Sequence, residues 1–230
     1  MPEFFYSGYF NYILYMVPAY LFVLFVQMRL KSTVSKYSNV RVRSGMTGRD
    51  SAQTVLSHGG AFGVQIRPIN GQLTDNYDPT TNVISLSTPV YGENSVTAVG
   101  IAAHEAGHAL QYADEYGPAK LRSAAVKVCN LGSRLAFPLI FIGIIASIDV
   151  LVIAGIICFS AVVVFQLITL PVEFNASKRA VEVLGQSGTL TDEELKGVRK
   201  VLNAAAMTYV GALATSVFQL LYYLSRTRRR

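Results

Sequence analysis

Two of the chain's three histidines, His104 and His108, lie four residues apart in the segment "AAHEAGHALQYADEYGP" (residues 102–118). In a helix this spacing puts both imidazoles on one face, where they can bind the same ion. Glu105 lies one residue further round, outside the direction in which the imidazoles converge, and can take a proton from a metal-bound water. The pattern predicts a zinc site of hydrolytic type. The alternative is a helix whose two histidines are ordinary surface or core residues.

A catalytic zinc needs a third protein ligand and an open position for water. In one class the motif continues as x-x-G-x-x-H or x-x-G-x-x-D, which would make Asp114 the ligand, but Gln111 occupies the glycine position. Without a glycine turn the helix should continue and carry Asp114 about 240° away from His108. The favoured ligand is Glu173 in "LPVEFNASKRA", on a second helix, and a single Zn²⁺ is expected. Alternatively, this carboxylate snorkels at a membrane boundary.

Small residues surround both halves of the predicted site, which should let the two helices pack closely. Around the histidines these are Ala102, Ala103, Ala106 and Gly107, and after Glu173 they are Ala176 and Ala180.

Long apolar stretches dominate the rest of the chain, which is 51% hydrophobic and 15% charged over 230 residues. No charged residue occurs in residues 9–28, 135–148, 150–172 or 202–225. Because a bilayer core needs about 20 apolar residues per helix, three to four transmembrane helices are expected. The fold class is therefore a mainly α, polytopic membrane protein, with zincin-like catalytic helices and a small antiparallel β element.

Four regions follow from these stretches. Residues 1–28 form a transmembrane anchor, because neither a preceding Lys or Arg nor a cleavage site marks a signal peptide. Residues 29–134 form a soluble zincin part with the "HEAGH" helix. Residues 135–172 form a transmembrane hairpin with Asp149 at its turn. Residues 173–230 hold the third-ligand helix, an amphipathic helix and a C-terminal apolar helix.

The soluble part contains several local signals. Thr47 with Asp50, and Thr191 with Glu194, have the spacing of helix capping boxes. The "HEAGH" helix should begin near residues 94–95 and run to Tyr116, where Gly-Pro follows.

Two strands are also expected there. The segments "FGVQIRPI" (62–69) and "NVISLS" (82–87) alternate as strands do, and the turn-rich segment between them predicts a small antiparallel sheet or hairpin. Asp75 and Asp78 should hold the turn; the alternative is calcium binding.

The net charge of +6 comes from basic residues that lie beside the apolar stretches. This arrangement is a topology signal and not a nucleic-acid surface, so no nucleic-acid partner is expected. It predicts the cell (cytoplasmic) membrane, an active site on the cytoplasmic side and an outside N-terminus. If residues 202–225 also cross the membrane, "RTRRR" (226–230) lies on the outer side, contrary to the positive-inside rule. Whether residues 202–225 cross the membrane is therefore left open. Cys129 and Cys158 lack metal-ligand spacing and are interpreted as apolar helix residues.

The chain resembles the YugP-type neutral zinc metallopeptidases of bacterial membranes. The resemblance is carried by "HEAGH", "PVEFNASKRA", "LTDNYDP" (73–79) and "LTDEELKGVRKVLNAAAMTYV" (190–210). The order of elements is also similar to the HtpX-type gluzincin membrane proteases. The resemblance implies His104, His108 and Glu173 as zinc ligands and Glu105 as general base. HtpX-type proteases typically carry Asp four residues after the ligand Glu, supporting a ligand histidine. Here that residue is Ser177, and Asn175 is a second candidate for the role.

A donor for the tetrahedral oxyanion would assist peptide hydrolysis. Tyr77, Tyr112 and His58 are candidates, although each also has a structural explanation. The nearby strands could present an edge to which an extended peptide adds.

Together these features predict an integral membrane zinc metalloendopeptidase that cleaves membrane or membrane-proximal polypeptides. The expected partners are the polypeptide substrate and the lipid bilayer, with a regulatory membrane protein or a second copy of the chain as further candidates. The rival hypothesis is a non-catalytic zinc-binding membrane scaffold, but a structural zinc uses four protein ligands, whereas the sequence offers three and a base. A zinc transporter would need ionisable residues within the spans, where only Asp149 qualifies.

Overall fold

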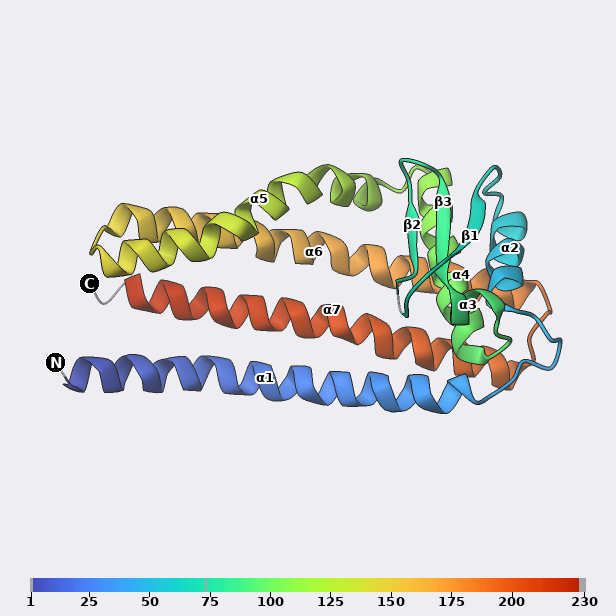
Figure 1. Ribbon diagram of the computed structural model, residues 1–230, viewed down its shortest axis with the longest axis horizontal. Coiled ribbons are helices and arrows are strands. Elements are labelled where there is room, and N and C mark those ends of the chain that lie inside the picture. Colours follow the sequence, from blue (N-terminus) through green and yellow to red (C-terminus); the bar gives the residue numbers. More distant parts are fainter. Residues whose placement is uncertain (1, 73, 228–230) are drawn as a thin grey trace. The chain divides into compact units, whose positions relative to one another are not determined.

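A computed structural model describes residues 2–72 and 74–227, so Leu73 and the last three arginines lie outside it. The chain is mainly helical (Figure 1). Its elements are α1 (Pro2–Ser38), α2 (Gly48–Gly59), β1 (Gln65–Ile69), β2 (Asn76–Asp78), β3 (Val83–Ser87), α3 (Thr88–Gly92), α4 (Val96–Ala113), α5 (Gly117–Ile145), α6 (Asp149–Gln186) and α7 (Asp192–Thr227). They form two compact units, which are described separately.

The first unit comprises Met1–Gln27, Leu121–Leu170 and Thr208–Arg230. It contains parts of α1, α5, α6 and α7. Within the described residues, these are the four helices that are long and apolar enough to cross a membrane. Large apolar side chains such as Leu21, Phe137 and Ile157 are at least 60% exposed, which suits contact with lipid. The predicted fold class is confirmed, and α7 supplies the fourth candidate span as one unbroken helix.

A tight helical hairpin lies within this unit. α5 ends at Ile145 and α6 begins at Asp149, so the predicted turn is found at the expected place. Glycine lets the two helices approach, because a Cβ on Gly155 would lie only 2.9 Å from the carbonyl oxygen of Ala136 and from the nitrogen of Ile140.

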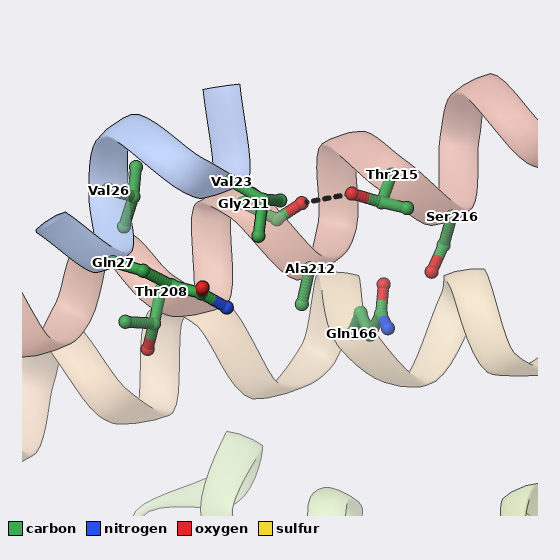
Figure 2. A pocket seen from close by; sticks show the side chains of 9 residues that line it. All are labelled: Val23, Val26, Gln27, Gln166, Thr208, Gly211, Ala212, Thr215 and Ser216. Atoms are coloured by element: carbon green, nitrogen blue, oxygen red, sulfur yellow. Dashed lines mark hydrogen bonds between the residues drawn. The ribbon is translucent and has the colours of Figure 1, made fainter. Parts of the chain in front are cut away.

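The same unit contains a cavity of about 370 Å³ between α1, α6 and α7 (Figure 2). No charged residue lines it; the lining residues are Val23, Val26, Gln27, Gln166, Thr208, Gly211, Ala212, Thr215 and Ser216. The Thr215 hydroxyl donates to the Gly211 carbonyl at 2.9 Å. The Oε1 atom of Gln166 is buried and accepts no hydrogen bond from the described residues. A buried carboxamide oxygen without a donor is costly within a helical bundle.

The second unit comprises Met28–Lys120 and Pro171–Met207, and its apolar core forms around α2, α4 and β3. The predicted capping box of α2 is confirmed, because Thr47 accepts from the Asp50 nitrogen while the Asp50 carboxylate accepts from the Thr47 nitrogen. Thr191 and Glu194 form the same pair of bonds at the start of α7.

The small sheet is mixed, and the predicted antiparallel pairing of its two long strands is wrong. The strand order is β1-β3-β2, with β1 parallel to β3 and β2 antiparallel to β3. The connection after β1 is long enough to return the chain in parallel, and it contains β2, whose three residues show no apolar alternation. The hairpin is therefore β2–β3.

Two aspartates organise this region. The Asp78 carboxylate accepts from the Thr80 nitrogen and the Thr81 hydroxyl, so its predicted turn role is confirmed. Asp75 instead accepts from the nitrogen and hydroxyl of Ser87 and thereby joins the loop before β2 to the end of β3.

α4 begins after Ser95, whose hydroxyl accepts from the Ala98 nitrogen. It ends at Ala113, so the predicted extension to Tyr116 is wrong. Glu115 adopts a φ of 54° and redirects the chain, and α5 then starts at Gly117. The turn comes before Gly-Pro because the backbone nitrogens of Glu115 and Tyr116 donate to the carbonyls of Tyr112 and Gln111, which closes the end of the helix.

Candidate metal centre

The two histidines of α4 face a single carboxylate. His104 and His108 lie one turn apart, with ring centroids separated by 4.7 Å. The Nε2 atom of His104 is 3.2 Å from Glu173 Oε2, and that of His108 is 3.5 Å from the same oxygen. Glu173 lies on α6 and is only 1% exposed. The structure therefore brings together the three side chains that the sequence singled out as ligands.

These residues have the composition of a zinc site. Their ligand atoms all lie within 4.8 Å of one another, and the described residues form no other such group of three or more. Two imidazole nitrogens and a carboxylate oxygen match the donor set of catalytic zinc sites, in which a fourth position stays open to water. Convergence of both Nε2 atoms on one buried carboxylate oxygen shows that this donor set fits such an ion.

Close packing of α4 against α6 allows this convergence. A Cβ on Gly107 would lie 2.3 Å from the carbonyl oxygen of Ala176, so only glycine fits at this position. Ala103, Ala106 and Ala180 are completely buried in the same region. The small-residue surface expected from the sequence is therefore the surface on which the two helices meet.

Each histidine is also bonded through its second ring nitrogen. The Nδ1 atom of His104 lies 3.1 Å from the hydroxyl oxygen of Ser177 on α6. The Nδ1 atom of His108 lies 3.1 Å from Oε1 of Gln111 on α4. Such outer bonds orient ligand imidazoles and fix the nitrogen that faces the metal. Ser177 thus occupies the position expected for the supporting residue.

Gln111 is the residue that sequence reasoning missed. Gln111 lies within α4 and is completely buried. Its Nε2 donates to the Val172 carbonyl at 2.8 Å and to Asn175 Oδ1 at 2.9 Å. Asn175 is therefore connected to His108 by two hydrogen bonds through Gln111. The available signal was its spacing, since Gln111 follows His108 by three residues and shares its helix face.

The residues that close α4 have a different role. Asp114 caps the helix and forms an ion pair with Arg179 of α6, in keeping with its rejection as a ligand. Arg179 also donates through Nε to Asn175 Oδ1 at 2.9 Å.

Glu105 differs from the other polar residues around the site. It is half-buried on α4, directly after His104, and forms no hydrogen bond or ion pair within the described part of the chain. Its carboxylate is therefore without a partner among the described residues.

The weaker candidates have structural partners. Tyr77 donates to Asn82 Oδ1 at 2.9 Å, and its ring lies 5.7 Å from that of Tyr112. Burial, with the nearby Tyr112 and Asp78, raises the pKa of Tyr77, so its hydroxyl stays protonated. The Tyr112 hydroxyl donates to the Ala119 carbonyl at 3.4 Å. His58 Nδ1 lies 3.0 Å from the Thr54 carbonyl oxygen on α2.

Long apolar helices and a His-His-Glu cluster beside a second glutamate define a membrane protein with a zinc-peptidase type of site. The sequence profile of the family described as "Putative neutral zinc metallopeptidase" matches residues 12–228, and the chain belongs to this family. It is 47% identical over 200 residues to the "Putative membrane protease YugP" of Bacillus subtilis (strain 168), covering 86% of this chain and 88% of that protein. No solved structure matches the chain. The resemblance to the YugP-type family predicted from the sequence is thereby confirmed.

Proposed function

We propose that the protein is a gluzincin-type zinc endopeptidase of the cytoplasmic membrane, which hydrolyses peptide bonds of membrane or membrane-proximal polypeptides. The observation that carries this proposal is the convergence of His104, His108 and Glu173, whose ligand atoms lie within 4.8 Å of one another. Glu105 follows His104 on α4 and forms no hydrogen bond with the described residues. Membership of a zinc metallopeptidase family and the membrane-type helices support it.

The three converging side chains would hold one Zn²⁺, through the Nε2 atoms of the histidines and the carboxylate of Glu173. A bound zinc would supply Lewis-acid chemistry, by acidifying water and polarising the scissile carbonyl. Ser177 and Gln111 orient the two imidazoles from behind. Three protein ligands leave a position for reactants, whereas a purely structural zinc takes four.

Glu105 moves the protons in this proposal. Its carboxylate takes a proton from the attacking water and afterwards delivers it to the leaving amine. The absence of hydrogen bonds to Glu105 from the described residues suits this exchange, because no existing bond must break first. A positioned general acid–base group of this kind contributes about 10²–10⁴-fold to a rate.

The edge of β2 is the proposed binding place for an extended substrate. Among the described residues, β2 pairs with β3 alone, and Tyr77 on β2 packs against Tyr112 on α4, the helix that carries both histidines. A peptide backbone can add to such an edge through main-chain hydrogen bonds. The other edge strand, β1, is less suited, because Pro68 interrupts its donors.

The side of the membrane is proposed from charge. Lys and Arg are abundant in residues 29–134 and 173–200, whereas residues 1–8 have none. The positive-inside rule then places the catalytic unit in the cytoplasm.

The test compares wild type with Glu105→Gln and Glu173→Ala in lipid nanodiscs, by metal analysis and by cleavage of a fluorogenic peptide library. Glu105→Gln should keep zinc and lose cleavage by about 10²–10⁴-fold. Glu173→Ala should lose zinc affinity as well. Glu182→Gln, an exposed change on the same helix, serves as the control and should behave as wild type. Full cleavage by Glu105→Gln would refute the mechanism, whereas zinc binding without cleavage in wild type would indicate a scaffold.

A further inference from the structure

A continuous chain of hydrogen bonds runs from Arg179 through Asn175 and Gln111 to His108. We propose that Arg179 and Gln111 are positioning residues that keep the ring proton of His108 on Nδ1. Nε2 is then the ring nitrogen that is left for the metal, because it is the nitrogen that faces Glu173. The inference rests on the proposed function in one respect, namely that His108 is a zinc ligand.

The direction of the chain is set at Arg179, because a guanidinium can only donate. Its Nε donates to Oδ1 of Asn175, so the oxygen and not the amide nitrogen of Asn175 must face it. Arg179 is itself held by the Asp114 carboxylate and by the ring of Tyr116, whose centroid lies 5.7 Å from the guanidinium carbon. These contacts fix which end of the Asn175 amide points toward Gln111.

Gln111 transmits this direction. Its Nε2 contacts two oxygens that can only accept, Oδ1 of Asn175 and the carbonyl of Val172. A flipped amide would place the acceptor Oε1 against both of these oxygens and remove the two hydrogen bonds that Gln111 donates. Because Gln111 is completely buried, water cannot replace the lost bonds. The orientation of the Gln111 amide is therefore determined by its neighbours.

The fixed amide then selects one form of the imidazole. Oε1 of Gln111 faces His108 Nδ1 at 3.1 Å, and a carbonyl oxygen can only accept. The proton must therefore lie on Nδ1, and in a neutral imidazole this leaves Nε2 as the lone-pair nitrogen. Nε2 is the atom that faces Glu173.

His104 lacks this constraint. Its Nδ1 atom contacts the Ser177 hydroxyl, which can donate or accept and so permits either form of the ring. The two predicted ligands differ accordingly: His108 is preset by a chain that ends in a permanent cation, and His104 adjusts when it binds. Loss of the cation should affect His108 specifically.

The first test is the form of His108 in the zinc-free wild type at mildly alkaline pH. It is read from the ¹⁵N chemical shifts of the two ring nitrogens in nanodiscs. The proposal predicts that Nδ1 carries a proton, whether or not Nε2 also carries one toward Glu173. A ring that carries its proton on Nε2 alone would overturn the proposal without any variant.

The second test removes the cation. Arg179→Met should give a mixture of the two forms, and zinc affinity, measured by competition with a chromogenic chelator, should fall by about 10–100-fold. Lys178→Met is the matched control, since it deletes the same charge one residue earlier, at a side chain that is 71% exposed and pairs with Glu182. An unchanged ring form and unchanged affinity in Arg179→Met would contradict the proposal.

A third test replaces the acceptor. Asn175→Asp keeps an accepting oxygen for both Arg179 and Gln111 and should retain the Nδ1-protonated form and near-wild-type affinity. Asn175→Leu removes the acceptor and should lose both. Equal behaviour of the two variants would refute the proposal. The two proposals fail in different ways. A wild type that binds no zinc refutes the proposed function. The positioning of His108 by Arg179 and Gln111 is still decided by where the zinc-free His108 ring carries its proton.

Discussion

Gly107 lies where α4 contacts the backbone of α6, and Gly107→Ala tests whether this contact builds the metal centre. The added methyl carbon would lie 2.3 Å from the Ala176 carbonyl oxygen. Carbon–oxygen contacts of this type normally measure at least about 3.3 Å, so the helices must separate by about 1 Å. The contacted atom belongs to the helix backbone, which cannot move aside as the end of a flexible side chain could.

The displacement should reach the third ligand directly. Glu173 precedes Ala176 by three residues and shares its helix face. Metal–ligand distances tolerate only about 0.2 Å, so a separation of about 1 Å should lower zinc affinity by at least the 10–100-fold typical of a disturbed site. Stability should change less, because overpacking costs about 1–3 kcal/mol, whereas alanine gains about 1 kcal/mol over glycine within a helix.

The assay measures zinc affinity by chelator competition and thermal unfolding on the same samples. Gly100→Ala is the control on the same helix, since its methyl carbon would meet the Val198 Cγ1 atom at an ordinary 3.5 Å. Gly107→Ala should bind zinc far more weakly than Gly100→Ala. Equal zinc affinity in the two variants would refute the conclusion that the close approach at Gly107 is needed for the site.

Two further outcomes are expected. Gln166→Leu should leave the detergent-solubilised protein as stable as wild type or stabilise it by about 1–2 kcal/mol in thermal unfolding, because it removes a buried carboxamide oxygen that accepts no hydrogen bond from the described residues; a loss of that size would show that the carboxamide contributes to the bundle. Ser177→Ala should lower zinc affinity about tenfold by releasing Nδ1 of His104, and unchanged affinity would mean that the 3.1 Å contact does not orient the ring.

Much of the fold and the ligand cluster follows from local sequence patterns. The spacing of His104 and His108 indicates a shared helix face, and the apolar stretches indicate the candidate spans, because both signals depend only on helix geometry. Glu173 could be proposed because it lies at the end of an apolar run and is followed by small residues at helical spacing. The structure brings its carboxylate to the two imidazoles.

Features that depend on distant partners could not be predicted in the same way. Alternation identifies β1 and β3 as strands but does not state which strands pair, and β2 is too short to show a pattern. Gln111 similarly reads as one polar residue in a helix. Its importance arises from α6, which supplies Val172 and Asn175 as acceptors and excludes water.

The position of Glu173 in the chain has a consequence for biosynthesis. It lies 69 residues after His104, on α6 and therefore beyond the turn of the hairpin. At a synthesis rate of about 5–20 residues per second, the ribosome makes the "HEAGH" segment roughly 3–14 s before this carboxylate. During that interval the nascent chain carries two imidazoles and a base without their third donor. The centre is therefore completed only after the turn of the hairpin has been translated and the part of α6 that carries Glu173 has packed against α4.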